Sequence, residues 1–162
     1  MKTQLATPAA AARAHEEIFS YWSSLRRDGK LPGRADIHPA AFRKLLPTIS
    51  LIDVEREPLN YRLRLAGTGL YPVYGREITG RGLREVYSRE AADYWRAELD
   101  RIVRLRRPGV GCHSLAWKGQ PHVSMLWMRL PLASDGERVD MILGYDAVVG
   151  MAVEMSSGIR AA

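Results

Sequence analysis

Four histidines and a single cysteine are the residue types in this chain that most often bind metals or act in catalysis. None of the histidines, His15, His38, His113 and His122, stands in an HxxxH or HExxH pair. Cys112 is next to His113, but neighbouring side chains of a strand point to opposite faces, so these two do not converge. A metal ion needs three or four converging ligands. The spacing therefore favours ordinary polar strand residues, and we predict no metal site.

Nucleophilic and acid–base chemistry find little support in the sequence. Cys112 as a nucleophile would need a base, an orienting group and a lowered thiol pKa, and no such set is present. Asp135, Asp140 and Asp146 fall in a turn or alternate along a predicted strand, which favours solvent-exposed faces over a general acid–base pair. We therefore predict that the chain is not an enzyme and has no catalytic residues.

The segment Gly67-Thr68-Gly69 begins like the glycine-rich fingerprint of dinucleotide-binding sites. That fingerprint requires a third glycine three positions later, and this position is Pro72. The chain also lacks a glycine-rich loop that ends in Lys-Ser or Lys-Thr. The sequence therefore predicts no phosphate-binding loop.

A set of aromatic and aliphatic side chains is the best candidate for a binding site. If the strand alternation is read one way, most of these residues gather on the helix-covered face of a sheet. The candidate pocket residues are Leu65, Leu70, Tyr71, Tyr74, Trp95, Trp117, Met125, Trp127 and Tyr145. Such residues more often form a packed core than a cofactor site, so the sequence leaves both interpretations open.

The predicted strand with Met125 and Trp127 is apolar on both faces, because Leu126 and Met128 alternate with them. One face lines the domain interior. Large apolar patches seldom stay exposed, so the other face needs a cover. We expect this cover to be either the N-terminal helix or a second subunit in a homodimer. The interface candidates are Ile18, Tyr21, Trp22 and Leu25.

The periodicity of the chain predicts the elements that position these residues. Thr7-Pro8 begins a helix that runs to about residue 27, and Ser88 begins another that runs to about residue 106. Pro39 begins a short helix that Pro47 ends. Strands are predicted at residues 49–54, 61–66, 111–117, 122–132 and 138–148. The order predicts an α+β fold with a five-stranded antiparallel sheet and helices on one face.

Several of these segments resemble a known family. Residues 64–68 and 75–80 are similar to the RLAGT and GRE[IL]TG segments of PAS domains, in particular of a bacterial group of small single-domain PAS-like proteins. Residues 21–26 resemble the YWxxLR helix of that group. Residues 32–39 and 45–47 resemble its PxRxDIxP and LLP segments. The matches cover most of residues 21–80 and are specific for the family.

The resemblance implies a PAS-like domain at residues 31–150, preceded by an N-terminal helical extension at 1–30 and followed by a tail at 151–162. It implies a stand-alone sensory or adaptor domain in bacterial signal transduction. This domain would bind a small ligand, a signalling protein such as a histidine kinase, or both. Haem and a photoactive flavin are disfavoured, since the matching helical passage has neither His nor Cys. A small organic ligand stays open.

The composition agrees with one soluble domain of 162 residues, of which 46% are hydrophobic and 26% charged. No apolar run is long enough to span a membrane and no secretory signal is evident, so we expect a cytoplasmic protein. The net charge of +6 keeps a nucleic-acid-binding protein as one alternative, through Arg104, Arg106 and Arg107, although the scattered charges disfavour it. A small enzyme of similar cup-shaped fold is the other alternative.

Overall fold

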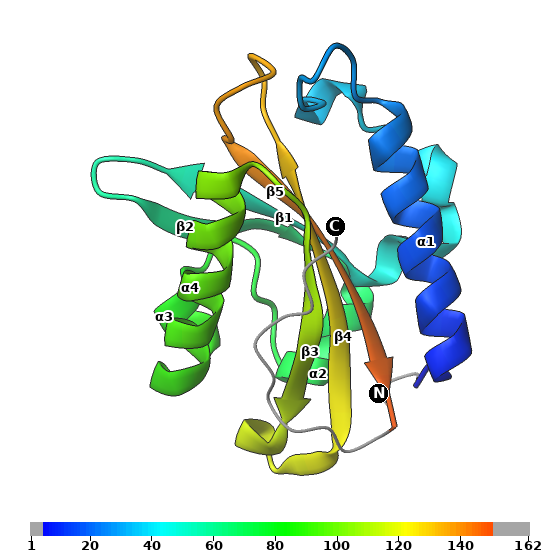
Figure 1. Cartoon of the computed structure of the whole chain (residues 1–162). Coiled ribbons are helices and arrows are strands. Elements are labelled where there is room, and N and C mark those ends of the chain that lie inside the picture. The colour runs from blue at the N-terminus through cyan, green and yellow to red at the C-terminus, as the bar shows by residue number, and fades with distance from the viewer. Residues whose placement is uncertain (1–4, 151–162) are drawn as a thin grey trace.

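The computed structural model describes residues 5–150, in which five strands form one antiparallel sheet. The strands are β1 (Ile49–Glu55), β2 (Asn60–Ala66), β3 (Gly109–Leu115), β4 (Gln120–Leu132) and β5 (Met141–Val149). Their order across the sheet is β2-β1-β5-β4-β3, so the first strand pairs with the last (Figure 1). The predicted α+β fold and antiparallel sheet are confirmed. The predicted tail at 151–162 lies outside the described residues.

One face of the sheet is covered by the helical segments between β2 and β3. They are η3 (Thr68–Leu70), α2 (Tyr71–Tyr74), α3 (Leu83–Val86) and α4 (Arg89–Leu105). The hydroxyl of Ser88 caps α4 as predicted, because it accepts a hydrogen bond from Ala91 N at 3.3 Å. The apolar stripe of α4 buries Trp95, Leu99 and Ile102 against the sheet. We call the space between these segments and the sheet the interior.

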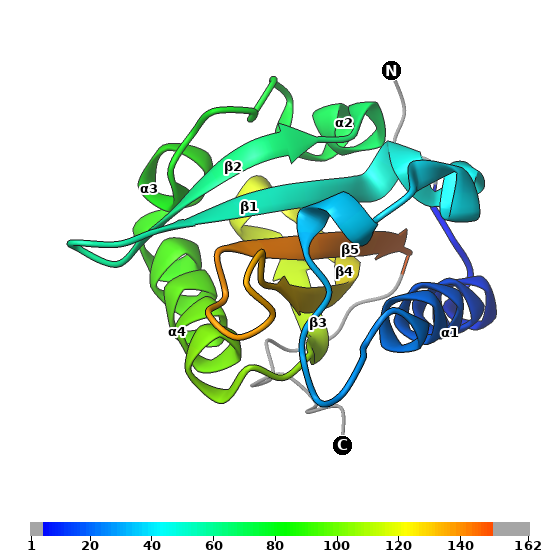
Figure 2. The same cartoon turned by 90° about the horizontal axis from the view of Figure 1, so that it is seen from above.

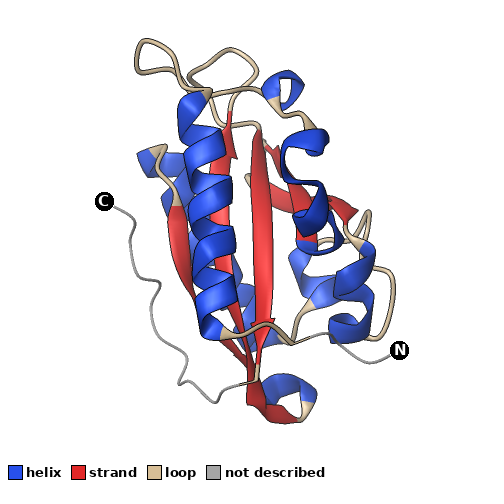
Figure 3. Ribbon diagram, turned by 90° about the vertical axis from the view of Figure 1, so that its right-hand side faces the viewer, coloured by secondary structure: helices blue, strands red, loops and turns tan. Residues whose placement is uncertain are grey.

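The opposite face is covered by α1 (Pro8–Ser24), which lies along the strands (Figure 3). Ile18 and Trp22 of this helix are 0% and 1% exposed. Trp22 Nε1 donates a hydrogen bond to the carbonyl oxygen of Pro131 in β4 at 3.0 Å. Tyr21 and Leu25, the other interface candidates, are half-buried. The N-terminal helix, one of the two covers expected for this face, therefore lies on it.

The segment between α1 and β1 contains η1 (Arg34–Asp36) and η2 (Pro39–Thr48) and meets the end of β2 closely. A Cβ atom on Gly67 would lie 2.3 Å from the carbonyl oxygen of Pro47, and one on Gly69 would lie 2.8 Å from the same atom. Only glycine permits this approach of two backbones. The glycines of Gly67-Thr68-Gly69 therefore have a packing role at the start of the helical passage.

Most strand boundaries differ from the prediction by one to three residues. β3 begins at Gly109, two residues earlier than expected, and β5 begins at Met141 rather than at Arg138. The side chain of Asp135 accepts hydrogen bonds from the backbone N–H groups of Glu137 and Arg138 at 2.9 and 2.8 Å. These bonds hold the residues in a turn, so β5 starts only beyond it.

Candidate functional site

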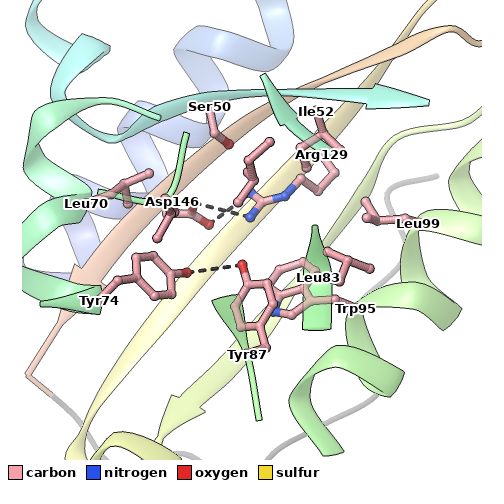
Figure 4. A pocket seen from close by; sticks show the side chains of 12 residues that line it. Ser50, Ile52, Leu70, Tyr74, Leu83, Tyr87, Trp95, Leu99, Arg129 and Asp146 are labelled. Atoms are coloured by element: carbon pink, nitrogen blue, oxygen red, sulfur yellow. Dashed lines mark hydrogen bonds and ion pairs between the residues drawn. The ribbon is translucent and has the colours of Figure 1, made fainter. Parts of the chain in front are cut away.

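Charged and aromatic side chains are buried together in the interior (Figure 4). Arg129 of β4 and Asp146 of β5 form a two-pronged ion pair, with Nη1–Oδ1 and Nη2–Oδ2 distances of 2.9 and 3.2 Å. Their side chains are only 3% and 2% exposed. Burying two charges costs several kcal/mol for each ion unless they are paired in good geometry. An ion pair in a domain core is therefore a poor source of stability, and its presence suggests a specific task.

The surroundings of Arg129 keep it charged and in place. Its Nη1 also donates hydrogen bonds to the carbonyl oxygens of Met128 and Tyr145, at 3.0 and 3.3 Å. Its guanidinium carbon lies 4.6 Å from the ring centroid of Trp95, a cation–π contact. Burial lowers the pKa of Arg129, but the carboxylate of Asp146 together with Tyr87 and Tyr74 more than offsets this, so the pKa of Arg129 is raised. The guanidinium is thus positive at any physiological pH.

Five buried side-chain nitrogen atoms in the described part of the chain have no hydrogen-bond partner, and all belong to this region. They are Arg129 Nε, Trp95 Nε1, Trp117 Nε1, and Nδ1 and Nε2 of His113. The His113 ring lies 5.7 Å from Trp95 and 6.3 Å from Trp117, measured between ring centroids. An unsatisfied buried polar group costs about 1–3 kcal/mol, so such a concentration calls for an explanation.

The protonation state of His113 follows from its surroundings. Its side chain is 0% exposed, and its ring stacks on Tyr94 at a centroid distance of 5.2 Å. Burial, reinforced by the charge of Arg129, lowers the pKa of His113 to about 4. The imidazole is therefore neutral at pH 7 and offers one hydrogen-bond donor and one acceptor.

The space left beside the ion pair is small. The cavity measures about 10 Å³, which is room for about one water molecule. Tyr74 and Tyr87 close one side of it, with their hydroxyl oxygens 3.2 Å apart (Figure 4). Burial raises the pKa of Tyr87 to about 12 and that of Tyr74 well above its ordinary value, so both hydroxyls stay protonated. A larger molecule enters only if these tyrosines move.

Six of the nine predicted pocket residues lie in or around the interior. They are Leu70, Tyr74, Trp95, Trp117, Met125 and Trp127. The hydroxyl of Tyr74 lies 3.8 Å from the sulfur of Met125. The rings of Trp95 and Trp127 are 5.1 Å apart between centroids. The structure thus brings together residues from α2, α4, β4 and the β3–β4 connection η4 (Ala116–Lys118).

Leu65 and Tyr71 are turned toward solvent, which corrects their predicted positions. Where β2 pairs with β1, Leu63 and Leu65 lie opposite the adjacent residues Ile52 and Leu51. This β-bulge shifts Leu65 out of the alternation that buries Leu63 and leaves it 45% exposed. Tyr71, the first residue of α2, is 50% exposed.

Tyr145 lies on the sheet face that α1 covers, so its predicted place in the interior is corrected too. It pairs with Met128, and its ring contacts that of His15 at a centroid distance of 5.5 Å. Asp146, the next residue of β5, consequently points into the interior. It does not lie on a solvent-exposed face, as its sequence position had led us to expect.

Four interior residues were not expected there from the sequence, namely Arg129, Asp146, His113 and Tyr87. A signal for Arg129 was available, because it follows Trp127 by two residues and so shares its face. His113 faces inward and Cys112 outward, as the alternation predicts. Tyr87, in the connection between α3 and α4, carries no pattern in its neighbours that reveals its position.

The remaining residue types considered for catalysis or metal binding, Cys112 among them, have positions that show no such site in the described chain. Cys112 pairs with Leu126 on the face that α1 covers, and burial raises the pKa of its thiol. Within residues 5–150, no three His, Cys, Asp or Glu side chains are grouped closely enough to hold a metal ion. No helix in that range combines the length and apolar character that crossing a bilayer requires.

The sequence model of the PAS domain matches residues 10–146 of this chain. The match begins in α1, includes the helical passage and α4, and ends at Asp146 in β5. Comparison with curated proteins finds no match. The family match spans most of the chain and agrees with the observed sheet and helices. The chain belongs to the PAS domain family.

Proposed function

We propose that this PAS domain senses a small organic molecule in its interior and passes the change to a signalling protein such as a histidine kinase. PAS domains are in general sensory and signalling domains. The observation that supports a ligand is the group of unpartnered buried polar atoms around the Arg129–Asp146 ion pair. A core that serves only stability has no use for such atoms, because each of them costs free energy.

The unpartnered atoms define the chemistry of the ligand. Arg129 Nε, Trp95 Nε1 and Trp117 Nε1 are donors, and neutral His113 adds one donor and one acceptor. Donors thus exceed acceptors. A molecule with carboxylate or carbonyl oxygens satisfies them, and the surrounding aromatic rings favour a flat one. The proposed ligand is therefore a small planar organic acid or carbonyl compound.

A single ordered water does not account for these atoms. The cavity of about 10 Å³ is lined by Trp95 and Arg129, but not by His113 or Trp117. A buried water makes about three hydrogen bonds, so one molecule in this cavity leaves part of the group unsatisfied. Entry of the ligand requires the cavity to widen, and the widening is the proposed signal.

The route of the signal follows from the residues that close the cavity. Tyr74 lies in α2, Tyr87 in the connection between α3 and α4, and Trp95 in α4. Displacement of the two tyrosines by a ligand therefore moves this helical passage against the sheet. Such a shift between two arrangements is the change that a partner protein detects.

The test is mass spectrometry of the small molecules that denaturation releases from the purified protein, together with an absorbance spectrum. The key variant is Arg129→Met with Asp146→Leu, which removes both charges and leaves no lone buried ion. The matched control is Arg64→Met with Asp53→Leu, which removes a partly exposed ion pair between β2 and β1. We expect a stoichiometric compound in the wild type and the control, and none in the key variant.

Two results would refute the proposal. One is an empty wild-type protein whose unfolding temperature is raised by no member of a panel of aromatic and aliphatic carboxylates. The other is a compound that the key variant retains at full stoichiometry, since the polar atoms around Arg129 would then not be what binds it.

A further inference from the structure

A groove on the surface separates the end of α1 from the end of α4 and has a volume of about 460 Å³. One wall contains Phe19 and Arg26, and the other contains Leu105 and Arg107. α1 and α4 both finish at the end of the sheet that faces the viewer in Figure 2, and the lining residues of the groove lie in the last turns of these helices and in the loops that follow them. The groove shares no lining residue with the interior site, and its proposed role rests on the movement of α4 in the proposed function.

The groove is positively charged and contains no carboxylate. Arg26, Arg106 and Arg107 line it, and no Asp or Glu is among its lining residues within the described chain. Apart from Arg129, four arginines in the described chain form ion pairs with acids. These pairs are Arg62–Glu55, Arg64–Asp53, Arg84–Asp93 and Arg101–Glu98. In residues 5–150, no ion pair includes an arginine of the groove.

Two of the groove arginines, Arg26 and Arg106, have contacts that hold them in position without neutralising them. The guanidinium carbon of Arg26 lies 5.3 Å from the ring centroid of Trp22. Arg106 ends α4 in the left-handed conformation, at φ 55°, and its Nη2 donates a hydrogen bond to the carbonyl oxygen of Gly136 at 3.2 Å. The same carbonyl accepts a hydrogen bond from Leu31 N at 2.9 Å. The turn that contains Gly136 therefore contacts lining residues on both sides of the groove. Most of the guanidinium donors remain available.

The apolar part of the groove narrows the choice of partner. Leu105 is 43% exposed and Phe19 is half-buried, so the groove offers apolar surface between its charges. A nucleic acid backbone would match the arginines but would leave this apolar surface uncovered, and it prefers an extended basic track. A peptide with acidic residues around an apolar one matches both features.

We infer that this groove is the docking site for an acidic segment of a partner protein, in which Asp or Glu residues flank a large apolar side chain. Its walls come from α1, which covers one face of the sheet, and from α4, whose Trp95 contacts Arg129 on the other face. A shift of α4 against the sheet changes the width of the groove. The docking site is thereby placed where a movement in the interior reaches the surface.

The test uses fluorescence anisotropy of the full chain with a short fluorescein-labelled peptide of Asp and Glu around a central Trp-Leu pair. The charge-reversal variant is Arg26→Glu with Arg107→Glu, and a milder variant is Arg26→Gln with Arg107→Gln. Arg106 is left intact because it ends α4. The matched control is Arg13→Glu with Arg43→Glu, which changes the net charge equally at exposed positions outside the groove.

We expect saturable binding to the wild type, a loss of about tenfold or more in the charge-reversal variant, and a smaller loss in the milder one. The control is expected to change affinity by less than about threefold at roughly 0.15 M salt, because distant charges are screened. Leu105→Ser should weaken binding of this peptide, and it should leave binding of a peptide without the Trp-Leu pair unchanged.

Three outcomes would overturn the inference. The first is that the peptide shows no saturable binding to the wild-type protein and does not change the unfolding temperature of that protein. The second is an equal loss in the charge-reversal variant and the control, which would mean attraction by net charge alone. The third is tighter binding of a fluorescein-labelled oligonucleotide that displaces the peptide, which would identify the groove as a nucleic-acid site.

Discussion

Lowering the pH is expected to destabilise the ligand-free protein through His113. The folded state lowers the pKa of this histidine from 6.5 to about 4, because the ring is buried and lies near Arg129. The unfolded chain therefore binds a proton more readily than the folded one. Stability contributed by neutral His113 is fully present above the unfolded pKa, and it is lost as the pH falls from 6.5 toward the folded pKa of about 4.

The size of the effect follows from the difference between the two pKa values. At about 1.4 kcal/mol for each pH unit, the fall from 6.5 to about 4 corresponds to about 3 kcal/mol in the free energy of unfolding. Between pH 7 and pH 5, where most paired carboxylates are still charged, about 2 kcal/mol of this should be lost. Such a loss is a large fraction of the stability of a small domain.

The assay is urea denaturation followed by circular dichroism at several pH values between 7 and 5. His113→Phe keeps a flat ring next to Tyr94 and removes the titrating group. Between pH 7 and pH 5, the free energy of unfolding of this variant should therefore fall by about 2 kcal/mol less than that of the wild type. His122→Phe, at an exposed position in β4, is the control and should follow the wild type. Equal pH dependence in the wild type and His113→Phe would refute the assignment of His113 as a buried, unpartnered ring.

Two further predictions concern the packing around the ion pair. Asp146→Leu alone should lower the free energy of unfolding by about 3–5 kcal/mol, because it leaves Arg129 buried without its partner. The double variant with Arg129→Met should have a free energy of unfolding near or above that of the wild type. Equal losses for the two variants in urea denaturation would contradict this prediction. Gly144→Ala should cost about 1–3 kcal/mol, because its Cβ would lie 2.3 Å from Ser50 Oγ and 3.1 Å from Arg129 Nη1. Adding Ser50→Ala should recover part of that loss in thermal unfolding, and an unchanged melting temperature of Gly144→Ala would show that the contact is absent.

Local signals in the sequence were sufficient for the five strands and the two long helices, although not for all their boundaries. Thr7 and Ser88 were predicted to cap helices, and each does so through its side-chain oxygen. These signals act over three or four residues, so they can be read without knowledge of the fold. The glycines at Gly67 and Gly69 were visible as a break after a strand, but their contact with Pro47 appears only once the two segments are placed together.

The candidate site was predictable only in part. Trp95, Met125 and Trp127 were expected in the interior from apolar periodicity, and the structure places them there. Arg129 and Asp146 were not expected, because a charged residue in an alternating strand is normally assigned to the wet face. Each charge can be buried only because the other one pairs with it, and the two residues belong to different strands.

The sequence by itself determined the elements of this protein, their order and its resemblance to the PAS family, since these depend on local periodicity and short segments. Only the tertiary structure decided which face of each strand is turned toward the interior. A strand repeats every two residues, so a shift of one residue exchanges its faces. Tyr145 and Asp146 exchanged places in this way, and a bulge moved Leu65 outward. The pairing of β4 with β5 therefore assembled the buried ion pair, and its unpartnered neighbours come from β3, η4 and α4.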